Sequence, residues 1–288
     1  MIEKKMEWGA HSLDFGKRTQ IMGIVNVTPD SFSDGGRFDS PQKAIDQGLR
    51  LADEGADIID VGGESTRPFS AGVALEEEIS RTAPVIEGLA RRLSIPISID
   101  TVKSGVAQRA LDAGAAMIND ISALSADPGM APLAAERRVP VVLMHMKGSP
   151  KTMQMDPSYS DVMAEIVEFL KNAVSRAVEK GIPKSMIIVD PGVGFGKTAA
   201  HNLEIIRRLK QMKTLGVPVL MGHSRKSFIQ KTLQDFAEKD MNPLLSVVET
   251  GTRAVSAAAI LNGADIIRVH DAAGAAATAR MIDAIIKS

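Results

Sequence analysis

The chain has 288 residues, 44% of them hydrophobic, and a formal net charge of −1. This near-neutral charge, with no block of lysine or arginine, excludes bulk attraction to nucleic acid or to an acidic membrane. The sequence contains no cysteine, which excludes disulfides, thiolate zinc sites and a cysteine nucleophile. Residues 1–5 are rich in charge and no apolar stretch follows them, so we expect no secretory signal and a cytoplasmic location.

The first predicted element is a β-hairpin within residues 1–20. Trp8, Leu13 and Phe15 alternate there with polar residues, which is typical of strands with one buried face. We expect this hairpin to close the bottom of the structure that follows it. Residues 1–288 are predicted to form a single domain, with the hairpin in residues 1–20 and a barrel in residues 21–288.

Eight short apolar runs then predict eight strands in chain order. The runs span residues 21–25, 57–61, 97–100, 116–119, 139–145, 186–190, 217–222 and 265–269. Most are continuous runs of valine, isoleucine and methionine, as expected for strands covered on both faces. Segments of helical period lie between them, and eight strand–helix units in order predict an α/β fold, the (β/α)8 TIM barrel.

The clearest predicted helix spans residues 161–180. Its apolar stripe is expected to consist of Val162, Ile166, Phe169, Leu170, Val174 and Val178. The late apolar segment 254–261 is too short to cross a bilayer.

Polar residues stand at the ends of nearly all the predicted strands. They are Asn26, Asp60, Asp100, Asn119, Asp120, His145, Asp190, His223, Ser224, Arg268 and His270. In a parallel barrel these ends meet at one rim, so we expect the side chains to converge there, although any single one is equally well explained as a helix cap. Asp100, Asn119 and Asp190 offer acceptors and donors to a flat, nitrogen-rich heterocycle, and a mismatched ring would leave polar groups unpaired.

Two segments are suited to anions. Residues 222–227 follow the seventh predicted strand and open a helix, where backbone N–H groups and a lysine favour a carboxylate or phosphate. A solvated basic turn is the alternative for this segment. Arg268 and His270 lie on the same side of the eighth strand by alternation and, with Asn26, are placed to surround a diphosphate. A Mg²⁺ ion would use Asn26, water and the phosphates of the substrate.

Residues 190–198 are glycine-rich but do not form a nucleotide-binding P-loop. That motif needs a glycine five residues before Gly196, and Pro191 stands there. We interpret Phe195 as a lid over a ligand, with local packing in a tight turn as the alternative. Two polar, glycine-bearing segments, residues 29–40 and 68–74, have the profile of loops that cover a substrate, with ordinary surface loops as the alternative.

Taken together, these segments resemble dihydropteroate synthase over nearly the whole chain. The resemblance is carried by residues 26–36, 62–68, 145–148, 152–154, 190–197, 224–227 and 268–271. It implies a transferase that condenses 6-hydroxymethyl-7,8-dihydropterin diphosphate with 4-aminobenzoate, giving 7,8-dihydropteroate and diphosphate in folate synthesis. It also implies Mg²⁺ as cofactor, small-molecule substrates, a homodimer and a sulfonamide target.

The resemblance assigns a role to each matching residue. It gives pterin binding to Asp100, Asn119, Met144, Asp190, Phe195, Gly222 and Lys226. It gives the diphosphate to Asn26, Arg268 and His270, with the metal at Asn26. It gives 4-aminobenzoate to Thr66, Arg67, Pro68, Phe195, Lys226 and Ser227, and the catalytic roles to Asp100, Asp190, Lys226 and Arg67. Phe69 stands where the family often has glycine, which leaves the shape of that loop and sulfonamide sensitivity open.

Two other functions stay open on the sequence alone. One is a pterin-binding barrel that transfers a methyl group from methyltetrahydrofolate to a corrinoid; it would share Asp100, Asn119 and Asp190 but has no use for a diphosphate site. The other is a catalytically silent paralogue that binds pterin, whose expected mark is a broken loop or a missing Lys226. Lys226 is present and the first loop is complete in sequence.

Overall fold

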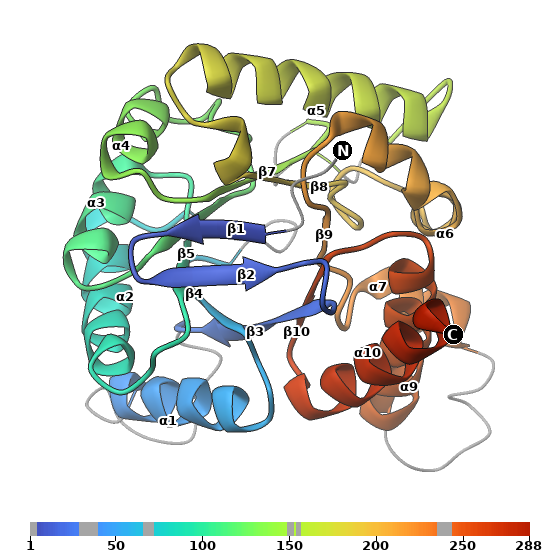
Figure 1. Cartoon of the computed structure of the whole chain (residues 1–288), viewed down its shortest axis with the longest axis horizontal. Coiled ribbons are helices and arrows are strands. Elements are labelled where there is room, and N and C mark those ends of the chain that lie inside the picture. Colours follow the sequence, from blue (N-terminus) through green and yellow to red (C-terminus); the bar gives the residue numbers. More distant parts are fainter. Residues whose placement is uncertain (1–4, 29–39, 66–71, 149–152, 154–156, 235–243) are drawn as a thin grey trace.

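Eight parallel strands surround the centre of the molecule (Figure 1). The computed structural model describes residues 5–28, 40–65, 72–148, 153, 157–234 and 244–288. The strands are β3 (Gln20–Asn26), β4 (Ile58–Gly62), β5 (Ile97–Asp100), β6 (Met117–Asp120), β7 (Val141–Met144), β8 (Ile187–Asp190), β9 (Leu220–Met221) and β10 (Ile266–Val269). Their order is β8-β7-β6-β5-β4-β3-β10-β9, and a parallel bridge between Val189 and Val219 joins the two ends. The predicted (β/α)8 barrel is therefore confirmed.

Helices cover the outside of these strands (Figure 1). They are α1 (Ser40–Asp53), α2 (Leu75–Ala90), α3 (Ser104–Asp112), α4 (Met130–Arg137), α5 (Val162–Glu179), α6 (Ala199–Arg208), α7 (Ser227–Thr232), α9 (Leu244–Leu261) and α10 (Ala272–Lys287). Two short 3₁₀ helices, η2 (Lys184–Met186) and η3 (Leu209–Leu215), precede β8 and β9. No helix within the described ranges is long and apolar enough to span a bilayer.

The seventh barrel strand is shorter than the sequence predicts. The apolar run 217–222 yields only the two-residue strand Leu220–Met221. Pro218 has no N–H to donate to a neighbouring strand, so regular pairing cannot begin before Val219. The carbonyl of Pro218 still accepts a hydrogen bond of 3.0 Å from the backbone N–H of Val189, which continues the contact between β8 and β9.

The interior of the barrel is filled from below by an apolar cluster that we call the floor. Its buried members are Met6, Trp8, Leu13, Met22, Ile58, Met117, Val142, Ile188, Leu220 and Ile266. Seven of these come from barrel strands and point inward, whereas their chain neighbours point outward into a second core between strands and helices. This alternation lets one strand serve two cores.

The remaining floor residues come from the hairpin, which crosses in front of the strands in Figure 1. Strand β1 (Lys5–Trp8) pairs with β2 (His11–Asp14), and Met6 stands opposite Leu13. The indole Nε1 of Trp8 donates a hydrogen bond of 2.8 Å to the carbonyl of Ala116, just before β6. Phe15 packs partly buried against the floor. The predicted hairpin that closes the bottom of the barrel is thus confirmed.

The long helix α5 confirms the predicted segment but corrects its buried stripe. Asp161 caps the helix by accepting a hydrogen bond of 3.0 Å from the N–H of Ala164. Val178, predicted to be buried, has 43% of its surface exposed, and Ala177 is buried instead. Val162, Ile166, Leu170, Val174 and Val178 of the predicted stripe are spaced four residues apart. In a helix of 3.6 residues per turn, each interval of four residues rotates the side chain about 40° further around the axis. Four such intervals separate Val178 from Val162, so the side chain of Val178 faces away from the barrel.

Candidate active site

The carboxyl ends of the strands carry polar side chains into one opening, which we call the mouth. The strand register aligns Asn26 with Gly62, Gly62 with Asp100, and Asp100 with Asn119. Gly62 leaves room between its neighbours: a Cβ atom placed there would lie 3.5 Å from Asp100 Cβ and 3.9 Å from Asn26 Oδ1. Three predicted site residues, Asn26, Asp100 and Asn119, are therefore neighbours.

A buried charge network crosses the mouth. The guanidinium of Arg268 donates from Nε to Asp60 Oδ2 at 2.6 Å and from Nη2 to Asp100 Oδ2 at 2.7 Å. The same Asp60 oxygen accepts a hydrogen bond of 3.0 Å from Asn119 Nδ2. Strands β4, β5, β6 and β10 are thus connected through four side chains. Arg268, expected beside the diphosphate, here lies against two carboxylates of the pocket.

The charges in this network perturb one another. Burial raises the pKa of Asp100 to about 7, against the lowering effect of Arg268 and with a further raising effect from Asp60. Burial acts to lower the pKa of Arg268, but the carboxylates of Asp60 and Asp100 raise it overall, so the guanidinium stays charged. Asp100 therefore changes charge near neutral pH beside a permanent cation.

The opposite wall of the mouth is formed by Asp190 and Lys226. Asp190 Oδ1 accepts a hydrogen bond of 2.6 Å from the N–H of Gly192, and a Cβ at Gly222 would lie 3.4 Å from Asp190 Oδ2. That same Cβ would lie 3.8 Å from Arg268 Cδ, which places this wall beside the charge network. Gly222, which has no side chain, therefore lies between Asp190 and Arg268.

The ammonium group of Lys226 donates to the carbonyl of Val193 and lies 4.3 Å from the centroid of the Phe195 ring. Burial lowers the pKa of Lys226 to about 8, although Asp190 acts to raise it. Burial also raises the pKa of Asp190, opposed by Lys226. Phe195 thus lies over the lysine that the sequence predicts to bind ligand, as a lid or a packing partner would.

Met144 completes the inner surface. It is aligned with Asp190 across β7 and β8 and is 3% exposed. Helix α7 begins at Ser227, directly after Lys226, so the predicted helix start at this segment is confirmed. His270 Nδ1 lies 2.9 Å from Ser224 Oγ, which ties the ends of β9 and β10 together.

Three polar residues predicted to converge on the mouth point away from it instead. Asp120 accepts from the N–H groups of Ser122 and Leu124, at 2.7 and 3.0 Å, and caps its own turn. His145 Nδ1 lies 3.0 Å from Lys197 Nζ, and His223 Nε2 lies 2.9 Å from Ser256 Oγ on α9. Each of the three follows an inward-facing residue, namely Asn119, Met144 or Gly222, so alternation turns it outward.

The sequence placed Asp60 only at the rim and gave Lys197 no role, yet both side chains are buried in the structure. Asp60 is fully buried and joins Arg268 to Asn119. Lys197 is 3% exposed, and its ammonium donates to the carbonyl of Phe195 at 2.9 Å; burial lowers its pKa well below the usual value. The signal for Asp60 was its inward position at a strand end, whereas nothing in the sequence marks Lys197 as buried.

Part of the predicted site lies outside the described residues. Thr66, Arg67, Pro68 and Phe69 belong to this part, as do residues 29–39. Among the residues that are described, no group of three or more histidine, aspartate or glutamate side chains could hold a metal ion. Asn26 Oδ1 offers one hard oxygen ligand at the mouth, which fits a Mg²⁺ ion held mainly by water and phosphate.

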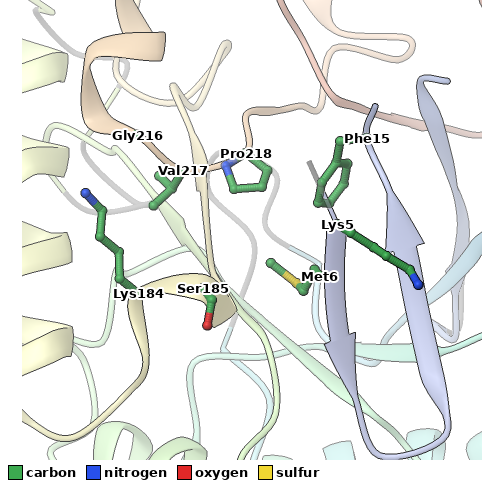
Figure 2. Close-up of a pocket in the computed structure, with 8 residues that line it drawn as sticks. All are labelled: Lys5, Met6, Phe15, Lys184, Ser185, Gly216, Val217 and Pro218. Atoms are coloured by element: carbon green, nitrogen blue, oxygen red, sulfur yellow. The ribbon is translucent and has the colours of Figure 1, made fainter. Parts of the chain in front are cut away.

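A second hollow lies at the other end of the barrel. This cavity of about 340 Å³ is shown in Figure 2. It is lined by Lys5, Met6, Phe15, Lys184, Ser185, Gly216, Val217 and Pro218. It lies between the hairpin and the segments before β8 and β9, and it contains none of the side chains of the mouth.

Comparisons with known proteins agree with this geometry. A family model described as "Pterin binding enzyme" matches residues 22–270. The dihydropteroate synthase of Synechocystis sp. is 46% identical over 96% of this chain and 93% of its own length, and that of Bacillus subtilis is 44% identical over 96% and 91%. A crystal structure of Xanthomonas albilineans dihydropteroate synthase with 4-aminobenzoic acid has a TM-score of 0.90 at 42% identity and covers 99% of both chains. Another structure of that enzyme contains 7,8-dihydropteroate.

Proposed function

The chain belongs to the dihydropteroate synthase family, and from this premise we propose how its residues divide the work of the reaction. The family activity joins 6-hydroxymethyl-7,8-dihydropterin diphosphate to 4-aminobenzoate. The bond between the pterin methylene carbon and the diphosphate oxygen breaks, and its electron pair leaves with the diphosphate. A bond from the arylamine nitrogen to that carbon forms, and the nitrogen loses a proton.

The pterin is held at the bottom of the mouth by Asp100, Asn119, Asp190 and Lys226, with Met144, Phe195 and Gly222 around the ring. The support for this assignment is their convergence on one opening, together with the burial of Asp190 and Asn119 at 6% and 5% exposure. Buried carboxylates select a ring that presents N–H groups, because a ring without them leaves the carboxylates unpaired. In its ionised form Asp100 also stabilises the positive charge that develops on the methylene carbon.

The diphosphate is assigned to Asn26, Arg268 and His270. Arg268 supports this role through its permanent charge beside Asp100. Mg²⁺, held by Asn26 and by the substrate, would neutralise charge on the departing diphosphate. Arg268 and His270 bind and orient the same group from the protein side. The contacts from Arg268 to Asp60 and Asp100 keep the guanidinium in the mouth before the substrate arrives.

4-Aminobenzoate is assigned to Thr66, Arg67, Pro68, Phe195, Lys226 and Ser227. Its carboxylate would rest at the start of α7, near Ser227, and its ring against Phe195. The arylamine is already a nucleophile, so the mouth needs to position it and exclude water rather than activate it. Lys226 and Phe195 lie together, so one pair of side chains serves both substrates.

We extend the proposal to assembly and location. A homodimer is supported by large apolar side chains that remain exposed on α9 and α10. These are Leu261, Met281, Ile285 and Ile286. A cytoplasmic location is supported by the substrate, since a highly charged diphosphate ester does not cross a bilayer unaided.

The observation that carries the proposed function is the shared mouth of Asp100, Asn119, Asp190 and Lys226 on a chain that matches synthases over 96% of its length. The test is incubation with the pterin diphosphate, Mg²⁺ and 4-aminobenzoate, with dihydropteroate and diphosphate measured together. We expect the two products in equal amounts. No diphosphate release would refute the synthase activity. Methyl transfer from methyltetrahydrofolate to a corrinoid would support the methyltransferase alternative. Tight pterin binding without turnover would support the catalytically silent paralogue.

A further inference from the structure

Asp60 is the most deeply buried charge of the mouth. It lies on β4, aligned with Ile24 on one side and Ser98 on the other, one inward position below Gly62. Its side chain has no solvent exposure. One oxygen, Oδ2, accepts from both Arg268 Nε at 2.6 Å and Asn119 Nδ2 at 3.0 Å. Asp60 therefore contacts two residues to which the proposed function gives opposite ends of the substrate.

We propose that Asp60 is a positioning residue that fixes the amide of Asn119 in one orientation and anchors Arg268, thereby setting which hydrogen-bonding atoms the mouth offers to the pterin. The inference rests on the proposed function and extends it to a residue that is not expected to touch the substrate. The inference concerns how the mouth recognises the edge of the pterin ring. Its measurable consequence is weaker pterin binding when the Asn119 amide is no longer held in one orientation.

The first step follows from the chemistry of the two side chains. An ionised carboxylate only accepts hydrogen bonds, so the group of Asn119 that faces Asp60 must be the NH₂ group. The amide oxygen of Asn119 is then directed away from Asp60. Asn119 is thus prepared as an acceptor, and the ligand atom opposite must be an N–H or amino donor.

The second step concerns Arg268. Its guanidinium spans Asp60 and Asp100, so two carboxylates share one cation. With only Asp100 as partner, the side chain would lose its Nε contact and could rotate about the remaining one. Fixing both nitrogens keeps the planar group in one orientation, which lowers the entropy lost when the substrate binds. Asp60 thus prepares Asn119 and Arg268 with the same oxygen.

The third step gives a signature that a purely structural residue would not produce. The pKa of Asp100 is lowered by Arg268 and raised by Asp60, Glu78 and Asp120 in decreasing order, and the ammonium of Lys226 also interacts with the charge of Asp100. Neutralising Asp60 removes the largest of the raising charges. The pKa of Asp100 then falls, and the acidic limb of kcat/KM, which reports the free enzyme, moves to lower pH.

The experiment compares Asp60→Asn with the matched control Asp120→Asn. Both aspartates are fully buried, lie on barrel strands separated by β5 alone, and would lose one charge. Asp120 accepts its hydrogen bonds from its own turn and has the weakest effect of the three carboxylates on the pKa of Asp100. We measure the affinity for an unphosphorylated pterin by calorimetry, the pH profile of kcat/KM, and the unfolding temperature.

For Asp60→Asn we expect pterin affinity to fall by about ten- to a hundredfold, the range of a lost hydrogen bond to a charged group. We also expect its acidic limb to shift to lower pH. Asp120→Asn is expected to keep its pterin affinity and to shift the acidic limb of the kcat/KM profile less than Asp60→Asn does. Equal loss of affinity in both variants, or an unchanged affinity in Asp60→Asn, would overturn the inference.

A rescue variant tests the orientation of the amide directly. Asn119→Asp, added to Asp60→Asn, restores an acceptor toward the ligand, and the amide introduced at position 60 can donate to the carboxylate introduced at position 119. We expect the double variant to recover part of the pterin affinity that Asp60→Asn loses; no recovery would contradict a role in orientation. If Asp60→Asn does not fold, the wild-type protein still decides: the side-chain amide protons of Asn119 should exchange slowly, and rapid exchange would refute the fixed amide.

The outcomes also separate this inference from the proposed function. Absence of dihydropteroate formation by the wild-type protein would refute the function whatever the variants bind. An active wild-type protein whose Asp60→Asn variant binds pterin equally well would refute only the role of Asp60.

Discussion

The floor and the mouth of the barrel are built by the same strands and are opposite in chemistry. Strand β4 contributes Ile58 to the floor and, two residues later, Asp60 to the mouth. Strand β8 contributes Ile188 to the floor and Asp190 to the mouth in the same way. The floor is apolar and capped by the hairpin, whereas the mouth holds two carboxylates and a guanidinium in one network.

The difference shows where stability is gained and where it is lost. Each large apolar side chain buried at the floor contributes about 1.5–3 kcal/mol relative to its exposed state. A buried charge costs several kcal/mol unless its partners compensate. The raised pKa of Asp100 shows that its partners compensate only in part, because burial outweighs the attraction of Arg268. Substitutions at the floor should therefore lower stability, whereas substitutions at the mouth should lower activity and leave stability little changed or raise it.

The largest expected effect is at the floor. Trp8→Ala removes a side chain that is 6% exposed and the hydrogen bond from its indole to Ala116. We expect a loss of about 3–5 kcal/mol in the free energy of unfolding, measured with urea, and an unchanged kcat/KM wherever the variant is folded. Trp8→Phe, which keeps a large ring, should lose much less. A fall in kcat/KM for the folded Trp8→Ala protein would show that floor and mouth are coupled.

The next effect is at the mouth. Lys226→Ala removes the ammonium group that contacts Val193 and Phe195 beside Asp190. We expect kcat/KM to fall by about a hundredfold, or about 3 kcal/mol of transition-state stabilisation, with weaker binding of both substrates. The stability of the protein should change little, because a buried cation with a lowered pKa contributes little net stability.

The neighbouring Arg225 provides the control for Lys226. Its guanidinium forms an ion pair with Glu249 on α9, away from the mouth. Arg225→Ala is expected to leave the steady-state constants of both substrates near those of the wild type. If Lys226→Ala also left both sets of constants unchanged, Lys226 would have no part in the site.

The floor was predictable because its pattern is local and repeated. Alternation of Trp8, Leu13 and Phe15 predicts a hairpin with one buried face, and continuous apolar runs predict strands covered on both sides. Both predictions are confirmed. The strand with a proline, near Pro218, was predicted too long because its apolar composition hides the missing N–H.

For the mouth, the sequence predicted which residues lie at the strand ends but not which way each side chain points. Asp100, Asn119 and Asp190 come together as expected, whereas Asp120, His145 and His223 turn outward. A displacement of one residue along a strand reverses the face, and the sequence does not locate a strand end to within one residue. The partners of Asp60 are 59 and 208 residues away along the chain, so no spacing rule reveals them.

The smallest expected effect is a pH-dependent change in stability caused by Asp100 at the mouth. The pKa of Asp100 is about 7 in the folded protein, above its ordinary value of 3.8. A carboxyl group with a raised pKa contributes its full stability below the ordinary value and loses it as the pH rises through about 7. Between pH 6 and pH 8, Asp100→Asn should therefore gain stability relative to the wild type, by at most about 1.4 kcal/mol per pH unit.

Urea unfolding of both proteins at pH 6, 7 and 8 measures this difference. Asp127→Asn is the control, because hydrogen bonds from the backbone near Ser104 lower the pKa of Asp127, which therefore stays ionised across this range. Its difference from the wild type should be independent of pH. A pH-independent difference for Asp100→Asn as well would mean that Asp100 is ionised throughout. In that case its attraction to Arg268 outweighs the cost of burial, and the mouth does not reduce the stability that the floor provides.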